Sequence, residues 1–357
     1  MEQLLGSIIK DSSKFPKIHA SAKAALEFME SYSRAPACEY RRKVLPVVSL
    51  TLESGNTRLS HQVVSVIHKL GKDDRFYSQE LEEEQSSWMT QQVTDALSSL
   101  PSTGADIQTA FLQAILTLSY HQCWIVSGKK YMFIVLKFFI HSLFLHPSGQ
   151  ICLQMLTLCQ DIVNKTNNTT TRSAAQNVAA NTVSCLGKWL CKTDTERGVE
   201  DVIPVMQYLC SKIEDGFTSA SDKGSKKDKM EREMLLCCLD TCVQSLNKKV
   251  TLSENFCTFI WRSLCPAVIK LLVRGSGHSV VCSLTSLMGH MESHRPVLEA
   301  TYHRMLIQTP PEKRLDGLKA ITKLLTDKRG LLDLCWLQSG REEKPATNTN
   351  DMAIIIM

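Results

Sequence analysis

Apolar residues recur along this chain at the spacing of amphipathic α-helices. In four segments an apolar residue returns every three or four positions: Leu59, Val63, Ile67 and Leu70; Ile107, Phe111, Ile115 and Leu118; Leu235, Leu239, Val243 and Leu246; and Leu318, Ile321 and Leu325. Because an α-helix turns once in about 3.6 residues, this spacing places the apolar side chains on one face. No stretch of five or more residues alternates convincingly between apolar and polar, as a half-buried strand would. The sequence therefore predicts an all-α protein whose helices need neighbours to cover their apolar faces.

The spacing of the predicted helices favours an irregular array of helix pairs. Successive pairs lie about 40 to 50 residues apart, which is the repeat length of HEAT and armadillo proteins. No consensus recurs from pair to pair, and only 16 glycines and 11 prolines occur among 357 residues. That content is too low for a β-sandwich or propeller, which turns about every ten residues. We therefore predict a HEAT/armadillo-like helical array, an α-solenoid.

Local signals place some boundaries of this array. Gly55-Asn56 lies between two apolar segments and predicts a helix–helix turn. Thr309-Pro310-Pro311-Glu312 combines a Thr N-cap, a proline at the first helical position and an acid three residues on, which predicts a helix start. A segment rich in Gly, Ser and Lys near residues 216–232 predicts a flexible linker. The predicted organisation is a helical domain over 1–215, the linker over 216–232, a second helical segment over 233–335 and a disordered tail over 336–357.

Charge and cysteine usage narrow the functional class. The net charge is only +5 and is scattered, which excludes the basic footprint of a nucleic-acid-binding protein. The N-terminus lacks the basic start and apolar run of a signal peptide. The 14 cysteines are therefore expected to stay reduced in the cytoplasm and to pack as small apolar groups.

The most apolar run in the chain is residues 131–145, YMFIVLKFFIHSLFL. A membrane-spanning helix needs about 20 apolar residues, and this run is shorter and interrupted by Lys137 and His141. A buried core helix and a helix-binding face are the two alternatives that fit better than membrane insertion. As a self-association face, the run would present five apolar residues: Phe133, Leu136, Phe138, Phe139 and Leu143.

The sequence contains no motif that predicts catalysis. Phosphate-binding loops and the nucleophile elbow are absent, so we expect no small-molecule substrate and no cofactor. His290 and His294 share a helix face at i and i+4, but the acid of a zinc protease is not in either required place. Cys238 and Cys242 also share a face, where core packing and a soft-metal or redox pair are the alternatives. We predict no metal site and a helical interaction scaffold.

Particular strings resemble a known family. Residues 41–70, RRKVLPVVSLTLESGNTRLSHQVVSVIHKL, with Arg75-Phe76 close behind, are similar to the dimerisation and cyclophilin-binding (DCB) region of the large Sec7-type Arf exchange factors. Residues 107–120 resemble the helix that follows there. Residues 259–269, FIWRSLCPAVI, are the most specific string, and they resemble the passage into the region called homology upstream of Sec7 (HUS). The brefeldin A-inhibited type is the most similar, with the Mon2-like proteins next.

The resemblance covers roughly residues 1–120 and 235–335 and implies a regulatory role. Such a region would dimerise, bind Arf/Arl-type small GTPases and associate peripherally with Golgi, endosomal or secretory-granule membranes. The Phe-Arg-Leu-Pro-Gly-Glu loop of the catalytic Sec7 domain is absent from this sequence, so we expect no enzymatic activity, and the change of sequence after Cys335 suggests a truncated form. Trp261 and Arg262 are the candidate partner contacts, with core packing as their alternative role. The rival hypothesis is a generic HEAT-type adaptor unrelated to Arf GTPases.

Overall fold

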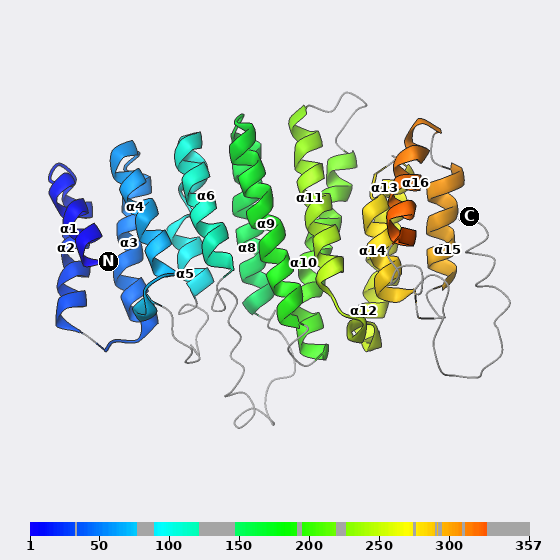
Figure 1. Ribbon diagram of the computed structural model, residues 1–357, viewed down its shortest axis with the longest axis horizontal. Coiled ribbons are helices and arrows are strands. Elements are labelled where there is room, and N and C mark those ends of the chain that lie inside the picture. The colour runs from blue at the N-terminus through cyan, green and yellow to red at the C-terminus, as the bar shows by residue number, and fades with distance from the viewer. Residues whose placement is uncertain are drawn as a thin grey trace, which may run out of the picture. The chain divides into compact units, whose positions relative to one another are not determined.

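The computed structural model describes residues 1–326 except 33, 77–88, 121–146, 191–194, 219–225, 274–275, 290, 292–294 and 309–310. Every regular element within these ranges is helical, which confirms the all-α prediction (Figure 1). Contacts divide the chain into two compact units, Met1–Leu186 (unit 1) and Gly187–Met357 (unit 2).

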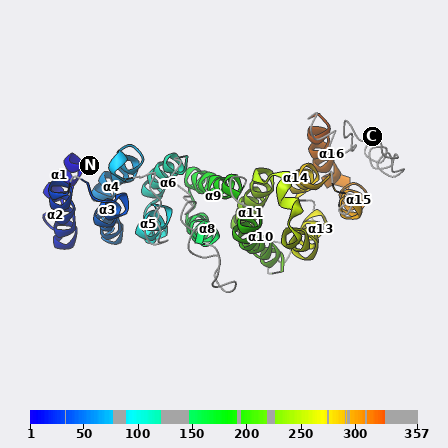
Figure 2. The same ribbon diagram turned by 90° about the horizontal axis from the view of Figure 1, so that it is seen from below.

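Unit 1 is built from helices in two layers. Its helices are α1 (Glu2–Asp11), α2 (Pro16–Ser31), α3 (Ala37–Glu53), α4 (Thr57–Leu70), α5 (Met89–Ala96), α6 (Ala105–Ser119), α8 (Pro147–Lys165) and α9 (Thr169–Leu190), with 3-10 turns η1 (Asp74–Phe76) and η3 (Leu100–Ser102). One layer holds α2, α3, α5 and α8, and the other holds α1, α4, α6 and α9 (Figure 2). The last four residues of α9 belong to unit 2. This stacking confirms the predicted solenoid-like array.

The apolar stripes predicted for α4 and α6 lie in the core of unit 1. Leu59, Ile67 and Leu70 in α4 are each at most 1% exposed, and the stripe of α6 is buried in the same way. The predicted turn before α4 is confirmed, because Gly55 adopts φ +65° and the Asn56 side chain accepts a hydrogen bond from the Leu59 N–H at 3.0 Å. Glycine tolerates this left-handed conformation and asparagine is a preferred N-cap.

Unit 2 repeats the two-layer arrangement. Its elements are α10 (Thr195–Thr218), α11 (Lys226–Ser245), η4 (Lys248–Leu252), α12 (Glu254–Phe259), η5 (Ile260–Leu264), α13 (Cys265–Val273), α14 (His278–Met288), α15 (Arg295–His303), η7 (Arg304–Gln308) and α16 (Pro311–Thr326). The helices α10, α13 and α15 form one layer, and α11, α14 and α16 form the other (Figure 2). The start of α16 at Pro311 agrees with the predicted helix start.

The predicted linker over 216–232 differs from the structure at both of its ends. Helix α10 extends to Thr218, helix α11 begins at Lys226, and the two helices pack against each other within unit 2. The compact units instead divide after Leu186. Lysine, arginine, methionine and glutamate are good helix formers, and Lys229 pairs with Glu233 one turn later at 4.0 Å. A charged run can therefore begin a solvent-exposed helix as readily as it forms a linker.

The prediction that Leu318 lies on the buried apolar face of α16 is wrong. This side chain is 50% exposed, whereas Ile321 is 3% exposed. The buried face is centred on Gly317, where a Cβ atom would lie 3.1 Å from Cγ of Met305 and 3.3 Å from Cδ2 of His278. The missing side chain lets α16 approach η7 and α14 through Gly317 and Ile321, so Leu318 is left on a flank of the helix.

Candidate interaction sites

The predicted contact residues Trp261 and Arg262 lie in the π-helical turn η5, between α12 and α13. Trp261 is 43% exposed and Arg262 is exposed as well. Core packing is therefore the wrong alternative for these two side chains. Their contact with a partner stays a prediction.

The helix around Trp261 is held in place by its opposite face. Phe256, Ile260 and Leu264 are fully buried there. The Ser253 hydroxyl accepts a hydrogen bond from the Phe256 N–H at 3.4 Å and so caps the start of α12. A π-turn adds one residue to a helical turn and is frequent at functional sites. The result is a firmly packed element that presents a tryptophan to solvent.

The predicted self-association face lies outside the residues that the structure describes. All five of its members fall within the undescribed range 121–146: Phe133, Leu136, Phe138, Phe139 and Leu143. Self-association through this face stays a prediction.

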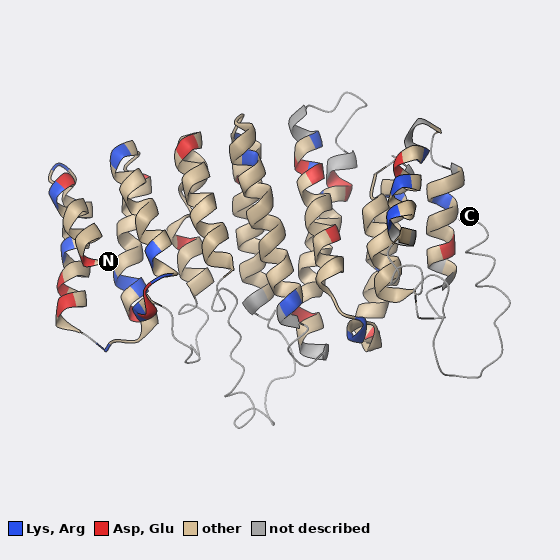
Figure 3. Ribbon diagram, in the orientation of Figure 1, with Lys and Arg blue, Asp and Glu red and all other residues tan. Residues whose placement is uncertain are grey.

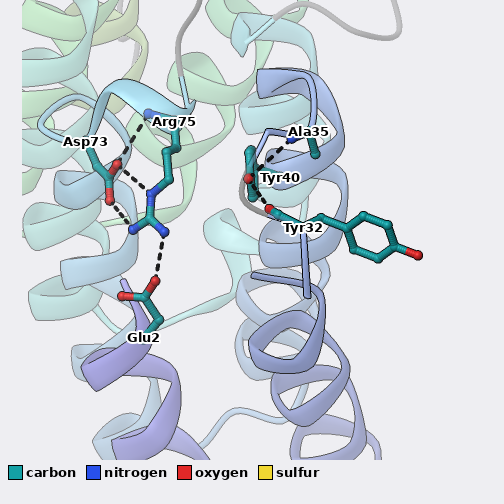
Figure 4. A network of polar contacts seen from close by, with 6 residues as sticks. All are labelled: Glu2, Tyr32, Ala35, Tyr40, Asp73 and Arg75. Carbon is teal, nitrogen blue, oxygen red and sulfur yellow. Dashed lines mark hydrogen bonds and ion pairs between the residues drawn. The ribbon is translucent and has the colours of Figure 1, made fainter. Parts of the chain in front are cut away.

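A polar network joins the start of α1 to the 3-10 turn η1, which follows α4 in unit 1 (Figure 4). Arg75 in η1 donates to both carboxylate oxygens of Asp73, from Nε at 3.1 Å and from Nη2 at 2.9 Å. Its Nη1 donates to Glu2 of α1 at 2.7 Å. These hydrogen bonds lower the pKa values of both carboxyl groups and raise the pKa of Arg75. With its charges satisfied, the network fixes α1 to η1 and offers no free acid or base for catalysis.

The turn between α2 and α3 has its own polar anchor, which Figure 4 also shows. The buried Tyr40 donates its hydroxyl hydrogen to the backbone carbonyl of Tyr32 and accepts a hydrogen bond from the Ala35 N–H at 3.4 Å. The Tyr32 ring is 59% exposed and stacks on the ring of Phe28 in α2, with the ring centroids 4.9 Å apart. The anchor therefore closes the turn beside a stacked and partly exposed pair of aromatic rings.

Arg41 is a buried arginine that the sequence analysis did not single out. Its side chain is only 1% exposed and lies between α3, η1 and α5. Nε donates to the Gln92 amide oxygen at 2.8 Å, and Nη1 donates to the backbone carbonyl of Phe76. Arg41 and Phe76 both belong to the strings that carried the family resemblance, and this was the signal that could have pointed to them. Nothing in those strings indicated that the Arg41 side chain is buried.

Within the described ranges, no group of three or more His, Cys, Asp or Glu side chains could hold a metal ion. His290 and His294 fall outside those ranges. Cys238 and Cys242 are both buried in the core, and burial raises the pKa of the Cys242 thiol to about 12. Charges of both signs are interspersed on the described helices, as Figure 3 shows.

Thiol labelling tests this assignment of the cysteines. We expect the exposed Cys237 to react with an alkylating reagent on the order of a hundredfold or more faster than Cys159, Cys210, Cys242 and Cys265, because burial raises the pKa of each of these four to about 12. Mass spectrometry of peptides after timed alkylation measures the rates. A Cys237→Ser variant should lose the fast reaction in the peptide that contains residue 237. Fast labelling of Cys242 in the native protein would contradict its place in the core.

His278 makes the stability of unit 2 sensitive to acid. Burial lowers the pKa of this imidazole, while the negative charge of Asp316 acts in the opposite direction. The unfolded chain, with a histidine pKa of about 6.5, therefore takes up the proton first as the pH falls. The stability of the folded state with a neutral, buried His278 is therefore fully present above about pH 6.5. It decreases as the pH drops below that value, because protons bind preferentially to the unfolded chain. We expect His278→Leu to show a smaller stability loss than the wild type between pH 7.5 and 5.5 in urea unfolding. Equal losses would refute this.

Fold and site together define a class: an array of stacked helix pairs that presents anchored surface residues. Comparison with models of known protein families finds no match, and no solved structure matches. The chain is similar to brefeldin A-inhibited guanine nucleotide-exchange protein 3 of Homo sapiens, 23% identical over 414 residues that cover 96% of this chain. It is 24% identical over 406 residues to the protein of the same name in Mus musculus, covering 94% of this chain.

The chain spans 18% of the length of each of these relatives. The similarity confirms the resemblance that the sequence strings carried. Among the described helices, none combines the length and the apolar character that a bilayer crossing requires.

Proposed function

We propose that this chain is a non-catalytic regulatory scaffold related to the large Arf exchange factors. In this proposal it self-associates, binds Arf/Arl-type GTPases and attaches peripherally to Golgi, endosomal or secretory-granule membranes. The observation that carries the proposal is the similarity over 96% of this chain to a guanine nucleotide-exchange protein of which it spans only 18%. A region of that kind is suited to positioning an exchange factor rather than to performing exchange.

A binding role is also favoured by the chemistry of the sequence. Exchange on an Arf protein requires an acid directed at the nucleotide phosphates and magnesium, and the family's loop that supplies it, Phe-Arg-Leu-Pro-Gly-Glu, does not occur in the sequence. Stacked helix pairs, in contrast, offer ridges and grooves that can accept a partner helix. The chain would therefore bind the GTPase without accelerating nucleotide release.

Trp261 and Arg262 are the residues on which we place the GTPase contact. Tryptophan and arginine are the residue types that most often dominate the binding energy of an interface. Both lie on the exposed side of η5, whose buried side is packed into unit 2. A partner would therefore meet a surface that is already ordered, which lowers the entropy cost of binding.

The test is binding to immobilised Arf- and Arl-type GTPases loaded with a non-hydrolysable GTP analogue or with GDP. We expect retention by a GTP form and at least a tenfold weaker affinity for Trp261→Ala, since an interface hot spot contributes about 2 kcal/mol or more. Leu252→Ala is the matched control, because Leu252 is 81% exposed on the neighbouring turn η4 and is not a predicted contact.

The same preparation is added to a GTPase carrying fluorescent GDP, whose release should keep its spontaneous rate. Equal binding to both nucleotide forms, or none, would reject the proposal in favour of a HEAT-type adaptor unrelated to Arf proteins. Accelerated GDP release would reject its non-catalytic part.

A further inference from the structure

His278 is a buried histidine at the first position of α14. It is 7% exposed, and its Nε2 atom is buried without a hydrogen-bond partner among the residues that the structure describes. A neutral imidazole can leave Nε2 as an unprotonated acceptor, whereas an imidazolium carries a proton on both ring nitrogens and must solvate both. The site therefore fits the neutral ring and not the cation.

Helix α16 covers the edge of the ring that carries Nε2. A Cβ atom at Gly317 would lie 3.3 Å from Cδ2 and 3.6 Å from Nε2 of His278. Because Gly317 has no side chain, the backbone of α16 closes directly over this edge. A proton on Nε2 can therefore be hydrated only if α16 moves away.

The start of α14 opposes a positive charge on His278 as well. The first N–H groups of a helix carry a partial positive charge. Helix α14 has 11 residues, and its N-cap, Gly277, has no side chain that could offset that charge. An imidazolium at the first position is therefore repelled by the helix dipole.

Asp316, which precedes Gly317 in α16, is the charged group that acts on His278 and favours its protonation. Its side chain is 65% exposed and pairs with Lys319 at 3.7 Å. Solvent screens the attraction of such an exposed charge. Burial therefore has the larger effect and lowers the pKa of His278.

Three other titratable groups act on α14 from neighbouring helices, and all three reach positions at least one turn beyond His278. They are Asp240 of α11, hydrogen-bonded to Ser283 at 2.6 Å; Tyr302 of α15, hydrogen-bonded to Thr285 at 2.7 Å; and Lys323 of α16, which acts on Cys282. The lysines of η4, Lys248 and Lys249, are exposed. Near the ring, η7 and α13 contribute the apolar side chains of Met305 and Leu271.

Helix α16 is held to unit 2 by a small buried face. Among its described residues, Gly317 and Ile321 are the buried ones, whereas eight residues of α14 are buried. Arg314 adds a hydrogen bond from Nη2 to the Ile307 carbonyl of η7 at 3.0 Å. Elements with few buried contacts open at the lowest cost in free energy. When the ring is protonated, α16 is therefore the element that moves.

We propose that protonation of His278 releases α16 from α14, which makes α16 an acid-sensitive latch on unit 2. The proposal is independent of the GTPase-binding function. Once α16 is released, the hydrated ring binds its proton near pH 6.5, as a free histidine does. Release should therefore become more frequent as the pH falls below about 6.5, by at most about tenfold per pH unit for one proton.

Amide hydrogen exchange in the full chain at pH 7.5 and 5.5, followed by peptide mass spectrometry, tests the proposal. After correction for the intrinsic exchange rate at each pH, we expect the protection of residues 311–326 to fall about three- to tenfold at the lower pH. At both pH values α16 should be at least about tenfold less protected than α14, because it opens without the rest of unit 2. Its exchange should also depend less on added urea, since its release exposes less surface than unfolding does.

Substitutions at two histidines separate the latch from other effects of acid. His278→Leu should abolish the pH dependence of α16 protection, and His278→Gln provides a second neutral side chain in case leucine disturbs the packing. His303→Leu is the matched control, because it removes an exposed imidazole at the end of α15 and should leave the pH dependence intact.

Three results would overturn the proposal. The protection of α16 could be the same at both pH values in the wild type. Its fall at pH 5.5 could persist in both His278 variants, which would make another group responsible. Helix α16 could also exchange at the rate and with the urea dependence of α14, which would mean that it opens only when unit 2 unfolds.

Discussion

Replacing Arg41 with alanine is expected to lower the free energy of unfolding of unit 1 by about 3 to 5 kcal/mol. The substitution removes a large side chain that is 1% exposed and leaves a cavity between α3, η1 and α5. It also leaves the Phe76 carbonyl and the Gln92 amide oxygen without the hydrogen bonds that Arg41 donates. Urea unfolding followed by circular dichroism measures the change.

Arg42→Ala is the matched control for this experiment. Arg42 is the next residue along α3, its side chain is 51% exposed, and it pairs with Glu39 at the surface. A surface ion pair of this kind contributes about 0 to 1 kcal/mol, so the control should change stability little. If both variants unfolded at the same urea concentration, Arg41 would not hold the position that the structure assigns to it.

Replacing Gly187 with alanine is expected to destabilise unit 2 by about 1 to 3 kcal/mol, the usual cost of overpacking. A Cβ atom at Gly187, in the last turn of α9, would lie 1.8 Å from Oγ and 2.6 Å from Cβ of Ser245 at the end of α11. Rotating the Ser245 hydroxyl removes the first clash, but the second requires the helix backbones to separate. Thermal unfolding by calorimetry measures the loss.

Gly6→Ala is the control for the same chemical change. Gly6 lies in the middle of α1, and nothing lies within 4 Å of a Cβ atom placed there. Alanine at this position should therefore stabilise the helix by about 0.5 to 1 kcal/mol. A second check is the double variant Gly187→Ala with Ser245→Gly, which should recover much of the lost stability. No recovery would contradict a direct contact between residues 187 and 245.

Much of the fold could be predicted from the period of apolar residues. The stripes beginning at Leu59 and Ile107 and the turn at Gly55 depend on local spacing and backbone freedom, which a sequence displays directly. Where a helix has apolar residues over a wide arc, periodicity does not reveal which part of that arc packs against neighbouring helices. In α16, both Leu318 and Ile321 lie on the apolar arc, and the close approach at Gly317 decides that Ile321 is the buried one.

The candidate sites likewise contain residues that could be predicted from the sequence and residues that could not. Trp261 and Arg262 could be singled out because they lie in one recognisable string. The network of Arg75 could not be predicted, because its partner Glu2 is 73 residues away in the sequence and only the tertiary fold brings the two together. The burial of Arg41 has a similar cause, since the carbonyl that it binds is 35 residues away.

Light scattering on a sizing column tests the proposed scaffold role most directly. The full chain of 40.0 kDa is run alone and with an Arf-type GTPase in its GTP and GDP forms. We expect a particle of twice the chain mass that carries the GTP form with it and leaves the GDP form behind. A monomer that elutes separately from both forms would contradict the proposed scaffold role.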